Sequence, residues 1–328
     1  MIDRLPDGFT VRPPTMDDVK ITTALIRLCD IAEQGDSIAT ESGTAAGWSE
    51  IIETLKNAAL LVFAPDGQLV GYARARNVAD VKFYVFIRVH PDYAQTGIPA
   101  YLLHRMENFA RQCASRFSSD ARIAMEAWIG DANVPMRSLF EQHGFSIVRS
   151  TWRMEIEMEQ TPPEPVLPQG IFIRTFFPGQ DERATFAAND EAFRDHWGHV
   201  PGNYDEWLRW AIEREDFDPT LYFLACDNDQ IAGVSLCLPK PALGWVDDLS
   251  VRRPWRHKGV GLALLQHTFR EFYRRGVHKV ALDVDSQNLT GATRLYHRAG
   301  MHIARRFNTY EKEIRSGVEL STQTLAIP

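Results

Sequence analysis

Residues 251–265 read VRRPWRHKGVGLALL, a stretch that gathers four Arg and Lys side chains and two glycines directly before an apolar, helix-like run. The whole chain of 328 residues carries a formal net charge of −7, so the local charge is opposite to the overall one. A helix that follows a glycine-containing loop presents unpaired backbone N–H groups at the positive end of its dipole. Glycine keeps these N–H groups open because it has no Cβ. The stretch therefore predicts a site for a small anion such as phosphate.

Two other phosphate-binding loops do not account for this stretch. A dinucleotide-binding fold requires a third small residue where Leu264 stands, although Asp283 follows Gly261 at a suitable distance. A Walker loop requires G-K-S or G-K-T, and neither occurs in the chain. On these residues alone, a solvated basic loop ahead of a glycine-rich helix start is the alternative.

Composition and charge narrow the class of protein. The chain is 45% hydrophobic and 24% charged, which is typical of a folded globular protein. Its acidic balance argues against nucleic-acid binding and against binding to anionic membranes, because both partners require a basic face. The four cysteines lie far apart without a CxxC pair, which predicts neither a zinc site nor a disulfide framework. Residues 1–25 lack a signal-peptide pattern and no apolar run of about 18 residues occurs, so we expect a cytoplasmic protein.

An internal repeat relates the two halves of the chain. Arg12 in GFTVRPP and Arg174 in GIFIRTF lie 162 residues apart. The same offset relates Gly97 to Gly259 in the glycine-containing loop. An offset kept over such a span indicates a duplicated domain.

The end of the repeat and the linker between the halves set the expected boundaries. EQHGF (141–145) matches HRAGM (297–301) at an offset of 156, which predicts a small length difference between the last strands. The proline-rich stretch 159–170, EQTPPEPVLPQG, suits a semi-rigid linker. We therefore expect one domain over residues 1–160 and a second over residues 168–328.

Hydrophobic periodicity gives the same element order in both halves. In the second half the expected strands are 170–176, 221–227, 230–238, 244–251, 279–285 and a last one from Met301, and the expected helices are 182–194, 203–214, 259–275 and 289–299. Asn228 and Asp229 mark a hairpin turn, and Gly276 suits the left-handed position just past a helix end. The order β-α-α-β-β-β-α-β-α-β is an α/β fold in which helices cover a sheet.

Two motifs in this order resemble the GNAT superfamily of acyl-CoA-dependent N-acetyltransferases. The R/Q-x-x-G-x-G/A loop of that family is matched by Arg256, Gly259 and Gly261. Its later N-x-x-x-A-x-x-x-Y-x-x-x-G-(F/M) pattern is matched by Asn288, Ala292, Tyr296, Gly300 and Met301. The resemblance covers the second half in full and the first half more faintly. It implies two tandem GNAT-like domains, each a mixed, mostly antiparallel sheet flanked by helices.

The resemblance also implies the cofactor acetyl-CoA and the residues that hold it. The diphosphate of coenzyme A would lie on the backbone amides of His257, Lys258, Gly259, Val260, Gly261, Leu262 and Ala263. The pantetheine arm would pair with the strand edge at Leu249, Ser250 and Val251, and Arg256, Asn288, Ala292 and Tyr296 belong to the same site. The local excess of positive charge, to which Arg252, Arg253, Arg256 and Lys258 contribute, would then hold a polyanionic cofactor within an acidic chain.

Acetyl transfer to an amine requires a base, a donor for the developing oxyanion and an acid for the departing thiolate. Strand alternation places Asp247 on the face of Leu249 and turns Asp248 away, so Asp247 is the predicted base if burial or a relaying water assists it. The resemblance assigns the acid role to Tyr296, and a backbone N–H at Leu249 or Ser250 is the predicted oxyanion donor. The alternatives are a structural acid at a strand end and a core tyrosine.

The stretch 189–207 joins the first two helices of the second half, where GNAT proteins form the wall of the acceptor site. Its candidate acceptor residues are Phe193, His196, Trp197 and Tyr204. Asp285 shares a strand face with Asp283 and would attract a cationic acceptor. Aromatic residues at this spacing also suit a core, and His196 and His199 lack a third patterned ligand, so no metal site is expected. The expected acceptor is a primary amine on a small molecule or peptide.

The first half departs from the family pattern at four positions. Ala94 and Pro99 replace the arginine and the second glycine of the loop, and Val85 and Phe140 replace the predicted base and acid. Proline also removes a backbone N–H donor. We therefore expect a non-catalytic first domain that supplies packing or part of the acceptor cleft. Two alternatives stay open for the chain, namely an acyl-CoA-binding or sensing protein without catalysis and a purely structural duplicate.

Overall fold

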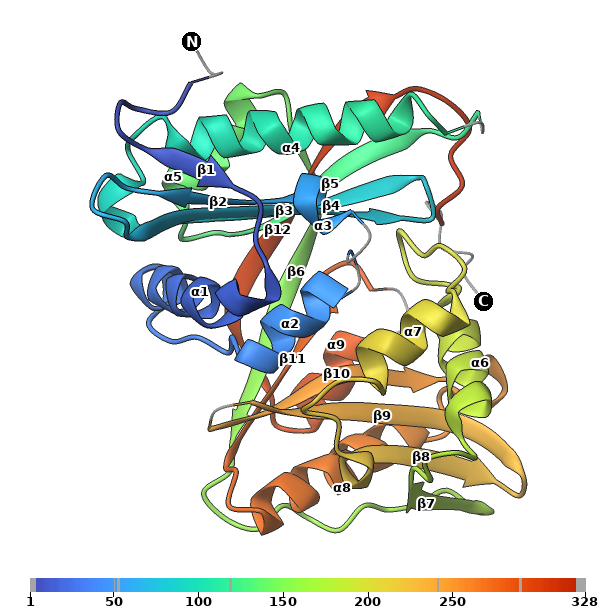
Figure 1. Cartoon of the computed structure of the whole chain (residues 1–328). Helices are drawn as coiled ribbons and strands as arrows, with labels where there is room; N and C mark the ends of the chain where they lie inside the picture. Colours follow the sequence, from blue (N-terminus) through green and yellow to red (C-terminus); the bar gives the residue numbers. More distant parts are fainter. Residues whose placement is uncertain are drawn as a thin grey trace. The chain divides into compact units, whose positions relative to one another are not determined.

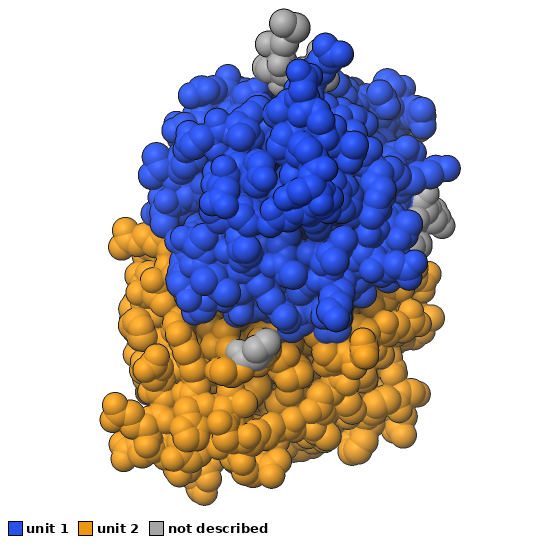
Figure 2. Space-filling view, turned by 60° about the vertical axis from the view of Figure 1, so that its left-hand side comes forward, with its two compact units in different colours: residues 1–150, 307–320 blue, residues 151–306, 321–328 orange. Residues whose placement is uncertain are grey.

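The structure is a computed structural model that describes residues 4–49, 51, 54–117, 120–240, 242–288 and 291–322 (Figure 1). It divides into two compact units, which Figure 2 colours separately. The first unit comprises residues 1–150 and 307–320, and the second comprises residues 151–306 and 321–328.

The two repeats exchange their last strands, which corrects the expected domain boundaries of 160 and 168. Strand β6 (Ser146–Glu157) ends the first repeat, but it pairs antiparallel with β11 (Lys279–Asp285) of the second unit. Strand β12 (His302–Arg315) ends the second repeat, and it pairs antiparallel with β5 (Ile123–Gly130) of the first. Each unit is therefore built from both repeats.

In the first unit the strands lie in the order β1-β2-β3-β4-β5-β12. Neighbouring strands are antiparallel except β4 and β5, which run parallel. The remaining strands are β1 (Thr10–Arg12), β2 (Ala59–Phe63), β3 (Leu69–Val78) and β4 (Lys82–Val89). The helices are α1 (Val19–Gln34), α2 (Glu41–Ser49), α3 (Leu55–Ala58), α4 (Ile98–Ala114) and α5 (Val134–Gln142).

In the second unit the strands lie in the order β6-β11-β10-β9-β8-β7. Here β10 and β11 are the parallel pair. The remaining strands are β7 (Ile171–Thr175), β8 (Tyr222–Asp227), β9 (Gln230–Lys240) and β10 (Leu243–Val251). The helices are α6 (Glu182–Phe193), α7 (Tyr204–Ala211), α8 (Val260–Arg274) and α9 (Ala292–Arg298).

Helices cover both faces of each sheet (Figure 1). In the second unit, Phe269 of α8 packs with Val246 on one face, and Trp207 of α7 packs with Leu236 on the other. The first unit repeats this arrangement with α4 on one face and α1 and α2 on the other. The expected fold class, α/β with mixed and mostly antiparallel sheets flanked by helices, is confirmed.

The element order of the second half agrees with the sequence pattern. The hairpin turn has Asn228 at a φ of 49°, and Gly276 has a φ of 78° just past α8. The expected helix over 289–299 appears as α9, and residues 289 and 290 lie outside the described residues. The length difference between the repeats is not between the last strands, because α4 has 17 residues against 15 in α8 and a longer loop leads from α4 to β5.

Candidate active site

The N-terminus of α8 has the open backbone N–H groups that the sequence predicts. Gly259 is the N-cap residue, and no side chain caps the helix. Among the described residues, the N–H groups of Val260, Gly261 and Leu262 donate to no protein acceptor. The next one, of Ala263, donates to the carbonyl of Gly259 at 3.0 Å. Three donors are therefore available to an anion at the positive end of the helix dipole.

Gly259 and Gly261 are needed for different reasons. Gly259 has a φ of +92°, a left-handed conformation that L side chains rarely adopt. His257 has a φ of 61°, so the loop enters the left-handed region twice before the helix begins. At Gly261 a Cβ would lie 2.9 Å from Cδ1 of Leu295 on α9. Glycine at 261 thus allows α9 to pack closely on α8, a reason that the sequence did not reveal.

Most of the positive charge in residues 252–258 is already paired with acidic side chains. Arg252 pairs with Glu191, and both Arg253 and Arg256 pair with Asp195. The hydrogen bonds from these two arginines, Arg253 first, hold the pKa of Asp195 well below its ordinary value. The predicted excess of positive charge at this loop is therefore largely balanced by acidic side chains of the protein itself. Of the four Arg and Lys side chains, only Lys258 has no ion-pair partner within the described part of the chain.

The guanidinium of Arg256 donates hydrogen bonds to three acceptors around the loop. Its Nη1 donates to Asp195 at 2.7 Å, its Nε donates to the carbonyl of Val251 at 3.0 Å, and its Nη2 donates to the carbonyl of Ala192 at 2.9 Å. These contacts tie the loop to the end of β10 and to the end of α6. The arginine of the motif therefore holds the backbone amides of the loop in place.

Strands β10 and β11 pair over two residues and then separate. Parallel pairing joins Gly244 to Val280 and Trp245 to Ala281. Beyond Trp245 the two strands form no further pairs in the described ranges, while β10 stays paired with β9 as far as Val251. One edge of β10 is therefore open where the pantetheine arm is predicted to lie.

Hydrogen-bond alternation decides which backbone groups face this opening. The N–H of Arg252 donates to the carbonyl of Ala232 at 2.9 Å, which makes these residues a hydrogen-bonded pair of the antiparallel ladder. Ser250 lies two residues away and turns its backbone groups to β9 in the same way. Leu249 and Val251 turn theirs toward the opening. Of the two predicted oxyanion donors, Leu249 is the one whose N–H faces it.

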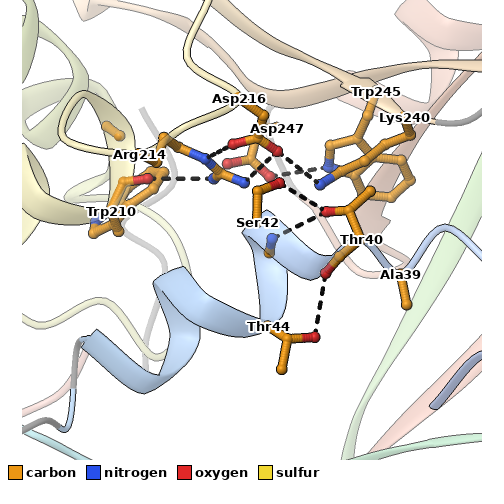
Figure 3. Close-up of polar contacts among 12 residues, drawn as sticks. Ala39, Thr40, Ser42, Thr44, Trp210, Arg214, Asp216, Lys240, Trp245 and Asp247 are labelled. Atoms are coloured by element: carbon orange, nitrogen blue, oxygen red, sulfur yellow. Dashed lines mark hydrogen bonds and ion pairs between the residues drawn. The ribbon is translucent and has the colours of Figure 1, made fainter. Parts of the chain in front are cut away.

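A β-bulge in β10 changes where the predicted base points. The register with β9 shifts between Val246 and Asp248, which leaves Asp247 as the extra residue. Val246 and Leu249 both pack in the core beneath α8, although three positions separate them. Asp247 lies on the other face with Trp245, whose indole Nε1 donates to its Oδ1 at 2.9 Å (Figure 3). The expectation that Asp247 shares the face of Leu249 is therefore wrong, whereas Asp248 does face away from Leu249, toward α6.

The surroundings of Asp247 raise the pKa of its carboxyl above the ordinary value. Loss of hydration has the largest effect, and the like charge of Asp283 adds to it. The hydrogen bond from Trp245 and the charges of Arg214 and Lys240 act in the opposite direction. Solvent still reaches the side chain of Asp247. Its carboxyl thus combines increased basicity with access for a ligand.

Asp248 is a second carboxyl on the same face. Its Oδ2 accepts a hydrogen bond from Nδ2 of Asn189 on α6 at 2.7 Å, and the hydroxyl of Ser250 donates to the Asn189 amide oxygen at 2.7 Å. Loss of hydration, followed by the charge of Asp247, raises the pKa of Asp248 to about 7. Sequence reasoning missed Asp248 because strict alternation allows only one of two consecutive acids on a face. The DD pair within a strand was the available signal.

Tyr296 lies on α9 in the core of the second unit, with 6% of its surface exposed. Burial raises the pKa of its phenol above the ordinary value. Ala292 begins α9, and Asn288 in the preceding loop donates its backbone N–H to the carbonyl of Asp285 at 3.0 Å. The motif residues thus lie on one helix and the loop that leads to it.

Three predicted acceptor residues follow one another at the end of α6. The rings of Phe193 and His196 meet edge to face with centroids 4.4 Å apart, and Trp197 comes next and is partly buried. Burial, followed by the positive charge of Arg256, lowers the pKa of His196 to about 4, while Asp285 acts in the opposite direction. His196 is therefore neutral at pH 7 and lies within electrostatic range of both the loop and Asp285.

Tyr204, the fourth predicted acceptor residue, begins α7 and packs against α6. Its ring centroid lies 5.5 Å from that of Phe186 and 6.2 Å from that of Trp207. The guanidinium of Arg183 lies 4.3 Å from the same ring. These contacts join the two helices, and a role for Tyr204 in acceptor binding stays a prediction.

Two other features, a group of metal ligands and a helix that could cross a membrane, do not occur in the described ranges. No group of three or more His, Cys, Asp or Glu side chains there is arranged to hold a metal ion. His199 is the second histidine of the stretch that contains His196, and its Nε2 lies 3.7 Å from Oδ1 of Asp190. None of the helices in these ranges combines the length and the apolar character needed to cross a membrane.

The first unit keeps the strand separation but not the bulge. Strands β4 and β5 pair only from Lys82 to Tyr84, and the register between β3 and β4 runs without a shift. Val85 and Phe140, which stand at the positions of Asp247 and Tyr296, lie in the apolar core beneath α4. Pro99 lies in the first turn of α4. These positions offer no proton-transfer group and one N–H donor fewer.

Sequence comparisons find relatives over most of the chain. The model of the acetyltransferase (GNAT) family matches residues 30–145 and 183–301. A mycothiol acetyltransferase of Arthrobacter sp. (strain FB24) is 30% identical over 258 residues, covering 74% of this chain and 76% of the relative. A mycothiol acetyltransferase of Geodermatophilus obscurus is 28% identical over 295 residues, covering 86% and 88%.

Solved structures show the same fold. The crystal structure of a GCN5-related N-acetyltransferase from Sphaerobacter thermophilus is 38% identical, with a TM-score of 0.81, and the match covers 98% of this chain and 100% of that one. A tandem GNAT protein from the clavulanic acid biosynthesis pathway is 15% identical, with a TM-score of 0.69 over 94% of this chain and 99% of that one, which is a likeness of fold alone. Because the family model matches one segment in each repeat and the relatives align across most of the chain, this protein is a tandem member of the GNAT acetyltransferase family.

Proposed function

We propose that the second unit transfers an acetyl group from acetyl-CoA to a primary amine of a small molecule or peptide. The observation that carries this proposal is the open N-terminus of α8 next to the separated edge of β10. The first feature suits a diphosphate, and the second suits the amide groups of a pantetheine arm. The relatives named mycothiol acetyltransferase support acetyl as the group transferred.

The chain provides polar groups for two parts of coenzyme A, the diphosphate and the pantetheine arm. The N–H groups of Val260, Gly261 and Leu262 would hold the diphosphate, and Lys258 would add a point charge. The backbone groups of Leu249 and the N–H of Val251, which face the opening, would pair with the arm, while the carbonyl of Val251 already accepts from Arg256. Acetyl-CoA, when bound, supplies the acetyl thioester.

The proposed reaction is direct attack of the amine, without a covalent enzyme intermediate. Asp247 accepts a proton from the amine, and its raised pKa makes it a better base than an ordinary aspartate. The N–H of Leu249 stabilises the developing negative charge on the carbonyl oxygen. Tyr296 donates a proton to the departing sulfur. The new N–C bond forms as the C–S bond breaks.

The remaining parts of the proposal concern the acceptor wall, the first unit and the compartment. Phe193, His196 and Trp197, with Asp285, would line the acceptor site. The first unit would not catalyse, since Val85 and Phe140 are apolar core residues. The described cysteines are all free thiols, which suits a reducing cytoplasm.

The test is acetyl-CoA-dependent thiol release with a panel of primary amines. Tyr296→Phe should lower kcat by about a hundredfold or more, because a general acid contributes on that order. It should leave the Kd for coenzyme A within about twofold, because the hydroxyl acts on the departing sulfur rather than on the diphosphate. Tyr273→Phe is the matched control, since Tyr273 lies on α8 and stacks on His278.

The same experiment separates the alternatives. Binding of coenzyme A without turnover of any amine would favour the non-catalytic acyl-CoA-binding protein. Equal loss of affinity and turnover in Tyr296→Phe would contradict the acid role. Absence of any thermal stabilisation by coenzyme A would overturn the proposal as a whole.

A further inference from the structure

Lys240 lies on the same face of the sheet as the proposed base. It is the last residue of β9 and pairs with Leu243 on β10. Leu243 is two positions before Trp245, so the pleat places the side chains of both strands at these positions on the face of Trp245 and Asp247. Figure 3 shows Lys240 directed toward the group formed by Arg214, Asp216 and Asp247.

The side chain of Lys240 is mostly buried, but solvent still reaches its ammonium group. Its side chain is 10% exposed, and Oδ2 of Asp216 lies 3.9 Å from Nζ, beyond hydrogen-bonding distance. Within the described part of the chain, Nζ of Lys240 donates to no acceptor. Partial loss of hydration without a replacing hydrogen bond is unfavourable for a charged donor. Consistently, burial and then the charge of Arg214 lower the pKa of Lys240.

The acidic side chains nearby are occupied by other partners. Asp216 accepts two hydrogen bonds from Arg214, one of them at 3.0 Å. Asp283 accepts two hydrogen bonds from Arg153, both at 3.0 Å. Asp247 accepts from Trp245. The ammonium of Lys240 can therefore donate to an acceptor that comes from outside the protein fold.

A ligand with a carboxylate would provide that acceptor next to the base. Its oxygens would give Nζ of Lys240 charge-assisted hydrogen bonds, which are the strong kind. A simple amine would offer the ammonium of Lys240 no acceptor, and in its protonated form it would add a second positive charge beside it. The arrangement of Lys240 and Asp247 on one face thus distinguishes acceptors by what they carry besides the amine.

We propose, on the basis of the N-acetyl transfer proposed above, that the acceptor is an amine that also carries a carboxylate, as an amino acid does, and that Lys240 binds this carboxylate. The acceptor nitrogen then lies toward Asp247, which takes its proton as the N–C bond forms and the thioester C–S bond breaks. Lys240 is a specificity residue in this scheme and takes no part in proton transfer.

The first experiment compares acceptors that differ only in the carboxylate. Tyrosine with tyramine and lysine with cadaverine are such pairs, and kcat/KM follows from thiol release. The wild-type enzyme should prefer the carboxylate-bearing member by about tenfold or more. Lys240→Met should remove the preference by lowering kcat/KM for that member, and Lys240→Arg should restore part of it. Lys279→Met, which removes a lysine paired with Glu155 on the neighbouring strands, should leave the preference unchanged.

The second experiment measures binding without turnover. In the presence of coenzyme A, the amino acid should raise the Tm of the wild-type protein more than the matching amine does, and Lys240→Met should abolish the difference. No preference in either experiment, or an equal effect of Lys240→Met on both members, overturns the proposal. A preference in binding without turnover of any acceptor would support Lys240 as the carboxylate site and contradict the acetyl-transfer function.

Discussion

The indole Nε1 of Trp245 donates a hydrogen bond to Oδ1 of Asp247 across 2.9 Å, from a position two residues earlier on the same bulged strand. A donor to a carboxylate stabilises the charged form, so this contact lowers the pKa of Asp247 against the effect of lost hydration. The indole therefore sets how much of the proposed base is deprotonated at a given pH.

Trp245→Phe should move the acidic limb of the pH profile of kcat/KM to higher pH. Loss of the hydrogen bond raises the pKa of Asp247, so the activity should fall by about threefold to tenfold on the acidic limb and should change little on the alkaline side of it. Trp128→Phe is the control, because Trp128 is half-exposed in the first unit and stacks on Phe307. An unshifted limb in Trp245→Phe would exclude Asp247 as the base.

The position of Asp247 could not be predicted from the sequence, although its role as a candidate could. Period-two alternation assumes a regular strand, and the bulge at Asp247 exists only through the pairing of β10 with β9. The same limit applies to the arginines of the loop. Their partners, Glu191 on α6 and Asp195 in the turn after it, lie about 60 residues earlier in the chain, and only the tertiary fold brings them near.

Arg153 connects the exchanged strand β6 to the face of the proposed site. Its guanidinium donates two hydrogen bonds to Asp283 at 3.0 Å each and lies 4.7 Å from the ring of Trp245. The side chains of Arg153 and Asp283 are only 8% and 13% exposed. Removing one member of a mostly buried charge pair strongly lowers the free energy of unfolding, because the remaining charge stays buried without its partner.

Arg153→Met and Asp283→Asn should each lower the free energy of unfolding by about 3 kcal/mol. The double variant should lose less than the sum of the two, by about 1 kcal/mol or more, since neither charge is then left alone. Urea denaturation followed by tryptophan fluorescence measures all three variants. Arg274→Met should lower the free energy of unfolding far less than either of them, because its ion pair with Glu271 is made by a side chain that is 72% exposed. Strictly additive losses would mean that the buried pair contributes nothing of its own.

Strand exchange explains why the sequence did not predict that Arg153 lies at the proposed site. Residues 146–157 alternate as an edge strand of the first repeat would, and the pattern is the same whichever sheet the strand joins. The element order, the hairpin at Asn228 and the helix end at Gly276 depend on local preferences and were predictable. The choice of partner for β6 and β12 depends on contacts between residues about 120 to 190 positions apart, which no local pattern encodes.

Gly259→Ala should weaken binding of coenzyme A more than it weakens the fold. A φ of +92° strains any L side chain by roughly 1 kcal/mol, and relief of that strain would turn the first N–H groups of α8 away from their present direction. We expect the Kd for coenzyme A, measured by calorimetry, to rise by about tenfold or more.

Gly276→Ala is the matched control for this change. Gly276 follows the other end of α8 and has a φ of +78°, and an added Cβ there would meet nothing within 4 Å. Its substitution should cost a similar amount of stability and leave the Kd unchanged. Equal effects of both variants on the Kd would show that the backbone conformation at Gly259 has no specific role in binding coenzyme A.

Asp248 should make the second unit less stable as the pH rises toward neutrality. Its pKa of about 7 in the folded state lies above the ordinary value of 3.8, so the folded state holds the proton more tightly than the unfolded state. The stability that follows is fully present below about pH 4 and is lost as the pH rises through about 7. Asp248→Asn stays neutral throughout and can still hydrogen-bond Asn189.

The urea midpoint of the wild-type protein should therefore fall from pH 5 to pH 8 more steeply than that of Asp248→Asn. The variant should be the more stable of the two at pH 8, since it carries no charge next to Asp247. Asp229→Asn, in the exposed turn between β8 and β9, should keep the wild-type slope. Parallel slopes for wild type and Asp248→Asn would mean that the carboxyl of Asp248 ionises in the folded protein as it does in water, and that the two neighbouring acids are open to solvent.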